Sequence, residues 1–175
     1  ETKAVKNKAQ VWVFNALEKI TDRLPFKVKG VDSDNGTEFI NHHLLNYCKE
    51  NEITFTRSRP YRENDNCFIE QKNWTVVRKT VGYRRYDTIE ERNLLNQIYE
   101  KLRLYTNYFQ PSMKLVGKKR DGAKVTKTYD KAKTPYRRLL ADGSISQSSK
   151  VRLKEEYLSI NPAKLNREIE SLRKE

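Results

Sequence analysis

Apolar residues recur at a helical spacing over the first part of the chain. Between residues 5 and 24 they lie three or four positions apart, which predicts an amphipathic helix with one face packed against a sheet. Pro25 ends this pattern because proline cannot continue a helix. The residues of the apolar face are Ala9, Val13, Ala16, Leu17, Ile20 and Leu24.

The next three segments change period from two to about 3.6 and back. Residues 26–34 alternate and predict a strand, residues 39–48 keep helical spacing, and residues 53–57 alternate again. Asn35-Gly36 alone is typical of a hairpin turn. The helical spacing after it favours a strand-to-helix junction, where open α/β sheets place binding residues. The fold class expected is therefore α/β.

The second half begins with a long helix. Thr88 and Glu91 have the spacing of a capping box, and the predicted buried face of the helix contains Leu94, Leu95, Ile98, Leu102, Tyr105 and Phe109. Two basic segments around Asp121-Gly122 then predict a hairpin or an extended arm. Thr134-Pro135 begins a short helix, a polar linker follows over 144–150, and two further helices are predicted near 150–160 and 162–174.

The charge of the chain is strongly positive and unevenly distributed. Thirty-six Lys and Arg against 23 Asp and Glu give a net charge of +13. Most of the excess positive charge lies in two segments, residues 58–86 and residues 111–138. The second segment alone carries ten basic and two acidic side chains. Clustered cations are what a polyanion requires; a solvated basic surface is the alternative interpretation. The cations expected to contact the phosphates of such a partner are Arg59, Arg62, Lys72, Arg78, Lys79, Lys118, Lys119, Arg120, Lys124 and Lys127.

Two classes of site find no support in the composition. Cys48 and Cys67 form no C-x-x-C pair and no disulfide framework, so both are expected to be ordinary reduced cysteines. No apolar run approaches the roughly 20 residues of a membrane span, so no membrane partner is expected. Tyr129 and Tyr136 in the basic segment are compatible with stacking on bases and equally with packing.

Two carboxylates are candidates for a metal site. Asp34 ends the first predicted strand, and Glu70 lies in the first turns of a predicted helix after a polar loop. Carboxylate oxygens are the ligands that Mg²⁺ prefers. A chain with 23 acidic residues contains such pairs by chance, so the surrounding residues decide.

The surrounding motifs are Asp34-Asn35-Gly36, Glu38-Phe39, Arg59-Pro60-Tyr61, Asn64-Asp65-Asn66, Ile69-Glu70 and Asn73. Together they resemble the catalytic core of the retroviral integrase and DDE transposase superfamily, most closely bacterial insertion-sequence transposases. The resemblance covers at least residues 10–110 and implies a partial ribonuclease H-like fold, a mixed sheet flanked by helices. The resemblance assigns residues 1–110 to the C-terminal part of the core. The sequence pattern alone adds a basic hairpin or arm with a short helix over 111–143, and a mostly helical tail over 144–175.

The resemblance also implies roles for individual residues. Asp34 and Glu70 would be catalytic ligands of Mg²⁺ or Mn²⁺, supported by Asn35, Asp65 and Asn73. The implied activity is DNA integration or transposition by metal-dependent phosphodiester cleavage and strand transfer. Its partners would be element ends and target DNA, with a homo-oligomer assembled on DNA in the bacterial cytoplasm, at the nucleoid.

One departure from the family pattern concerns its first catalytic Asp, which lies on an upstream strand. Before Asp34 the acidic residues are Glu1, Glu18, Asp22 and Asp32, and none fits that place, although Asp32 is a conceivable extra ligand. The expectation is a chain that starts inside the catalytic domain and is inactive alone. The alternatives are a non-catalytic DNA-binding remnant of a decayed mobile element and a cationic RNA-binding protein, which leaves the acidic motif unexplained.

Overall fold

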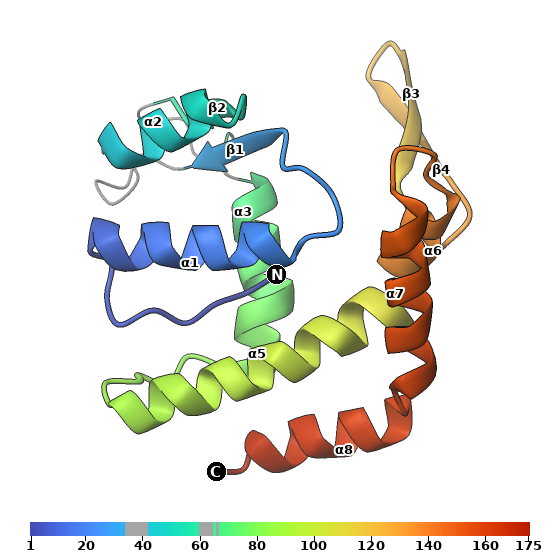
Figure 1. Cartoon of the computed structure of the whole chain (residues 1–175). Coiled ribbons are helices and arrows are strands. Elements are labelled where there is room, and N and C mark those ends of the chain that lie inside the picture. Colours follow the sequence, from blue (N-terminus) through green and yellow to red (C-terminus); the bar gives the residue numbers. More distant parts are fainter. Residues whose placement is uncertain (34–41, 60–64, 66) are drawn as a thin grey trace. The chain divides into compact units, whose positions relative to one another are not determined.

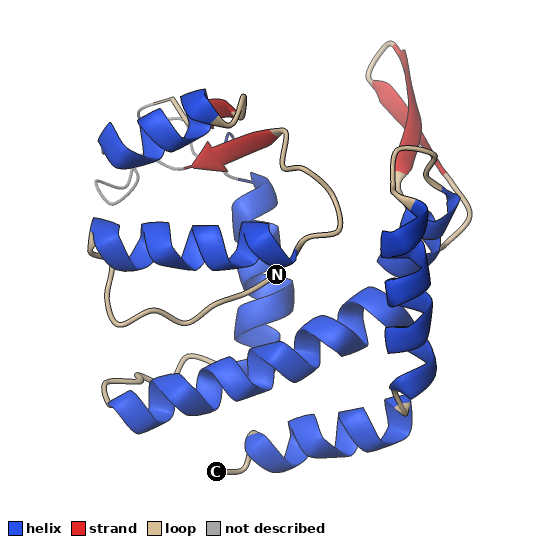
Figure 2. Ribbon diagram, viewed as in Figure 1, coloured by secondary structure: helices blue, strands red, loops and turns tan. Residues whose placement is uncertain are grey.

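The computed structural model describes residues 1–33, 42–59, 65 and 67–175. The chain is mixed α/β, which confirms the predicted class at that level (Figures 1 and 2). It divides into two compact units, Glu1–Gln97 and Ile98–Glu175. The three predicted regions, with boundaries at 110 and 143, stay predictions. None of the described helices is both long and apolar enough to cross a membrane.

Strand, helix and strand follow one another in the first unit, as predicted. Helix α1 spans Gln10–Arg23, strand β1 spans Gly30–Ser33, helix α2 spans His42–Glu50 and strand β2 spans Thr54–Arg57. The two strands pair in parallel, with Gly30 opposite Thr54 and Ser33 opposite Arg57. Parallel strands require a crossover connection, and α2 lies within that connection.

Both predicted elements at the beginning of the chain are shorter than expected. The helix expected from residue 5 begins at Gln10, because the preceding segment bonds elsewhere: Asn96 of helix α5 accepts from the Ala4 amide at 3.0 Å and donates to the Ala4 carbonyl at 3.1 Å. The strand expected from residue 26 begins at Gly30, where pairing with β2 starts. The alternation of apolar and polar residues therefore begins before the residues that pair with a neighbouring strand.

The core of this unit lies on one face of the small sheet. Leu44 and Cys48 of α2 are buried together with Ile53, and burial raises the pKa of the Cys48 thiol. Val31 and Phe55 are paired across the strands and pack against this cluster. On the opposite, exposed face Thr56 Oγ1 donates to Asp32 at 2.7 Å, so Asp32 does not face the core.

Leu44→Ala is expected to lower the free energy of unfolding by about 2–4 kcal/mol, because it removes buried methyl groups and leaves a cavity in a packed cluster. Leu44 is 2% exposed, whereas the neighbouring Leu45 on the same helix is 43% exposed. Leu45→Ala is therefore the matched control, with an expected change within about 0.5 kcal/mol. Urea denaturation of both variants measures the difference; equal losses would contradict this assignment of the core.

A helical segment with mixed geometry precedes the long helix. Helix α3 (Cys67–Lys72) continues into the π-helical segment η3 (Asn73–Arg78) and the short helix α4 (Lys79–Val81). The segment ends at Gly82, whose φ of 71° is the left-handed conformation that favours glycine. Helix α5 (Ile89–Phe109) then begins with the predicted capping box: Thr88 Oγ1 accepts from the Glu91 amide, and the Glu91 carboxylate accepts from the Thr88 amide.

The second unit contains the part of α5 from Ile98 onwards, a hairpin and three further helices. Strands β3 (Leu115–Asp121) and β4 (Lys124–Tyr129) are antiparallel, and helices α6 (Pro135–Ala141), α7 (Gln147–Ser159) and α8 (Pro162–Leu172) follow. Thr134 and Asn161 cap α6 and α8 and each precedes a proline, as predicted. The polar linker is shorter than predicted, because Ser146 accepts from the Ser149 amide and starts α7 at Gln147.

Aromatic rings hold the helices of this unit together. Tyr136 of α6 stacks on Tyr157 of α7 at 4.8 Å between centroids and contacts Tyr108 of α5 at 5.2 Å. Tyr136 is therefore a packing residue, and Tyr108, absent from the predicted buried face of the long helix, is part of this core.

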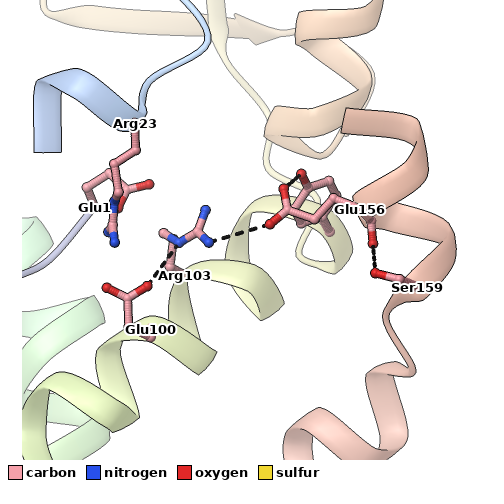
Figure 3. A network of polar contacts seen from close by, with 7 residues as sticks. Glu1, Arg23, Glu100, Arg103, Glu156 and Ser159 are labelled. Carbon is pink, nitrogen blue, oxygen red and sulfur yellow. Dashed lines mark hydrogen bonds and ion pairs between the residues drawn. The ribbon is translucent and has the colours of Figure 1, made fainter. Parts of the chain in front are cut away.

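Ion pairs add to the aromatic packing. Arg103 lies between Glu100 and Glu156, at 3.6 and 3.5 Å (Figure 3), and Lys101 binds Glu168 of α8 at 2.6 Å.

Candidate functional site

The carboxyl ends of β1 and β2 are held together by a pair of buried serines. The Ser58 amide donates to the Ser33 carbonyl at 3.0 Å, and Ser58 Oγ donates to the same oxygen at 3.2 Å. Both side chains are buried. The next residues in the sequence are Asp34 after Ser33 and Arg59 after Ser58. Asp34, Asn35 and Arg62 themselves lie outside the described residues.

Arg59 and Asp65, expected to act separately, bind one another. Arg59 Nε donates to Asp65 Oδ2 at 2.8 Å, Nη2 donates to Oδ1 at 2.9 Å, and the Arg59 amide adds a third bond at 3.2 Å. The Arg59 guanidinium and amide lower the pKa of the Asp65 carboxyl to about 2. The pair connects the end of β2 to the residues before α3, and it compensates both charges.

Glu70 differs from Asp65 in its surroundings. It lies on α3, as expected, and its side chain is exposed. Among the described residues none forms an ion pair with Glu70, so its carboxylate oxygens are available to a cation. Asn73, three positions further, is also exposed.

The π-helical geometry of η3 was not anticipated from the sequence. An α-helical period would place Glu70, Asn73 and Val77 on one face, but η3 begins at Asn73 and widens the turn. Val77 is half-buried while the other two residues are exposed. Single π-helical turns are rare and occur frequently at functional sites. The spacing of apolar residues did not predict the change to π-helical geometry, because the change occurs in a mostly exposed helix.

The predicted DNA contacts around Glu70 fall into two groups. Lys72 and Lys79 are exposed on either side of η3. Arg78 is engaged within the protein: its guanidinium lies over the Tyr83 ring at 4.7 Å, and Nη1 donates to the Gly82 carbonyl at 3.3 Å. Trp74 lies 6.4 Å from the Tyr83 ring, and both are exposed, a feature that sequence reasoning missed.

The five remaining predicted contacts lie on the hairpin. Its base is fixed by Asp130, which follows β4, and Arg138 of α6. Arg138 Nη1 donates to Asp130 Oδ2 at 2.5 Å, and Nη2 donates to Oδ1 at 3.2 Å and to the Ser112 carbonyl at 2.7 Å. Asp130 also accepts from the Lys114 amide at 2.6 Å. We call these contacts the hairpin latch. The hairpin residues concerned are Lys118, Lys119, Arg120, Lys124 and Lys127, all exposed.

The latch is expected to open in acid. Arg138 and the Lys114 amide lower the pKa of the Asp130 carboxyl to about 2. Because this folded-state pKa lies below the unfolded value of about 3.9, the stabilisation is complete above about pH 5 and is lost progressively as the pH falls through 2. A carboxyl-detected NMR titration of Asp130, followed with the β3 and β4 amides, should show a midpoint near 2. A midpoint near 3.9 would contradict the latch. So would β3 and β4 amide shifts in the Asp130→Asn variant that equal those of the unsubstituted protein.

Within the described part of the chain, no three His, Cys, Asp or Glu side chains gather closely enough to hold a metal ion. Cys48 and Cys67 are both free thiols in the structure, as expected.

The sequence is similar to an uncharacterized protein, y4rM of Sinorhizobium fredii (strain NBRC 101917 / NGR234). The two are 40% identical over 134 residues, which is 77% of this chain and 38% of that protein. The chain thus spans well under half of this relative's length. No protein-family model matches the sequence.

Proposed function

We propose that the chain is part of a DNA integrase or transposase with a ribonuclease H-like core, which cleaves DNA and transfers strands with the help of a divalent metal ion. The observation that carries the proposal is the parallel β1–α2–β2 unit, which brings the carboxyl ends of two strands together immediately before Asp34 and Arg59. Binding sites of open α/β sheets lie at this edge. A ribonuclease H-like core also requires further strands, which this proposal places in a longer protein.

The residues available fit a hard divalent cation. Asp34 and the exposed Glu70 would supply carboxylate oxygens, which Mg²⁺ and Mn²⁺ prefer. Asp65 is a poor candidate for the same ion, because Arg59 already neutralises it. A bound divalent ion would supply charge stabilisation at the phosphoryl oxygens in the transition state.

The chain's own residues would position the DNA. Exposed Lys72 and Lys79 flank η3 on the helix that follows Glu70, where they would bind backbone phosphates. Asn73 would donate to a phosphate or orient Glu70. In the proposed reaction water attacks a phosphodiester at the element end, which breaks the P–O3′ bond and releases the 3′-hydroxyl. That hydroxyl then attacks a phosphodiester of the target and displaces the 3′-oxygen of the target strand. No covalent bond to the protein forms, so no nucleophilic side chain is needed.

The proposal is tested by strand transfer with the full-length protein. A labelled DNA end, a target duplex and Mn²⁺ or Mg²⁺ are the other components. Metal-dependent joining of the end to the target is the expected result. If the full-length protein binds DNA but leaves it intact with either metal, the catalytic proposal fails.

The second candidate function is DNA binding without catalysis. It is favoured by the hairpin, because its exposed cations lie in the second unit and do not depend on either carboxylate. Unchanged DNA binding in Glu70→Gln, with no strand transfer by the unsubstituted protein, is the outcome that supports it.

A further inference from the structure

The β3–β4 hairpin has two unlike faces. Residues paired across antiparallel strands point to the same face, and alternate pairs point to opposite faces. A bulge between Leu115 and Gly117 keeps the Leu115–Tyr129 pair in phase with the alternating residues of β4. One side, which we call the cationic face, is formed by the pairs Leu115–Tyr129, Lys118–Lys127 and Arg120–Val125. The opposite face is formed by the pairs Gly117–Thr128, Lys119–Thr126 and Asp121–Lys124.

The charges of the two faces differ. The cationic face carries three basic side chains and no acidic one, whereas the opposite face pairs Lys119 with a threonine and Lys124 with Asp121. On the cationic face Lys118 lies directly opposite Lys127. Like charges in this arrangement destabilise a hairpin, and a two-stranded hairpin is marginally stable on its own. A repulsive pair at the centre of such a ribbon is stabilised when a polyanion lies against it.

Apolar contact area lies beside these cations. Val125, Tyr129 and Leu115 are 40–49% exposed on the same face. A phosphate-binding surface needs only charge, while apolar groups exposed between cations suit base edges, including the thymine methyl group.

We infer that the hairpin enters the major groove of duplex DNA with its cationic face towards the base edges, an inference that rests on the DNA-binding part of the proposed function. B-DNA's major groove is about 12 Å wide and admits a two-stranded ribbon. The hairpin's strands of seven and six residues give it a reach of roughly 20 Å. A tight two-residue turn, Gly122-Ala123 with φ of 56° at Gly122, keeps the tip narrow.

The hairpin is also presented in a way that suits insertion. Figure 1 shows β3 and β4 extending beyond helices α6 and α7 of the same unit. Every residue of the two strands except Gly117 is exposed. The hairpin latch fixes the base of this ribbon through Asp130, Arg138 and Ser112. A ribbon fixed at its base loses less conformational freedom on binding than a free arm.

The test compares two variants with equal loss of charge. Lys118→Ser with Lys127→Ser removes the central pair of the cationic face, and Lys119→Ser with Lys124→Ser removes two cations from the opposite face. Fluorescence anisotropy with a labelled 30-base-pair duplex is expected to show about tenfold or greater loss of affinity for the first variant and about threefold or less for the second. Equal losses in the two variants would overturn the assignment of the cationic face. Circular dichroism of both checks that the fold is retained.

A second comparison tests the groove itself. Duplex RNA of the same sequence carries the same number of phosphates, but its deep, narrow major groove cannot be entered by side chains. The unsubstituted protein is expected to bind the DNA duplex about tenfold tighter or more, and the first variant is expected to lose most of this preference. Equal affinity for DNA and RNA would overturn groove insertion while leaving strand transfer to be tested separately. Absence of binding to either duplex would contradict the DNA-binding part of the proposed function as well.

Discussion

Replacing Glu70 by Gln in the full-length protein is expected to reduce metal-dependent strand transfer by about a thousandfold. Gln preserves the shape of the side chain but carries no charge, so it cannot compensate a divalent cation. Glu70 is exposed on α3 and forms no ion pair among the described residues. The substitution should therefore leave the stability of the fold nearly unchanged, and the lost activity would report on the site.

The matched control for this experiment is Glu50→Gln. Glu50 is also exposed in the first unit, at the end of α2, and the proposed site does not include it. Its substitution removes the same charge and should leave strand transfer within about twofold of the unsubstituted protein, as surface substitutions usually do. Similar activity in Glu70→Gln and Glu50→Gln would remove Glu70 from the catalytic site.

Raising the salt concentration from 50 to 200 mM is expected to weaken binding to duplex DNA by about 500-fold. This magnitude corresponds to about five neutralised phosphates, each releasing condensed counterions. The five cations to which we assign these contacts are Lys118, Arg120 and Lys127, whose long side chains would reach the phosphates that flank the groove, together with Lys72 and Lys79 beside η3. Net charge alone does not identify the contacts, because the chain carries 36 basic residues.

Matched variants separate these cations from the others. Lys118→Ser with Lys127→Ser should lower the slope of log affinity against log salt by about two, whereas Lys154→Ser with Lys174→Ser should leave it unchanged. Lys154 and Lys174 are exposed on or beside α7 and α8, outside both basic segments. A slope that falls equally in both double variants would show that DNA is bound by diffuse charge.

Local patterns of the sequence predicted the elements but not their partners. Alternation and helical spacing located β1, α2 and β2, and the capping box located the start of α5, because these features depend on neighbouring residues. The pairing of Arg59 with Asp65, and of Asp130 with Arg138, depends on which side chains meet after folding. Charge counting therefore assigned Arg59 to DNA when it already had a carboxylate partner.

The hairpin illustrates the same division. Asp121-Gly122 correctly indicated a turn, but Asp121 is the last residue of β3 and the turn itself is Gly122-Ala123. The bulge between Leu115 and Gly117 decides which cations share a face. No periodic pattern in the basic segment reveals such a bulge, so the cationic face is visible only in the paired strands.

The most direct test of the central claim, that Asp34 and Glu70 hold one divalent ion, is the broadening of amide NMR signals by Mn²⁺. The measurement suits a weak site, which two carboxylates would form. The prediction is that Mn²⁺ broadens the amides of Ser33 and of Cys67–Lys72 together. Asp34→Asn and Glu70→Gln should each abolish both effects, and the double variant should add nothing further. Broadening at one of the two segments alone, or broadening that survives Glu70→Gln, would contradict a shared metal site.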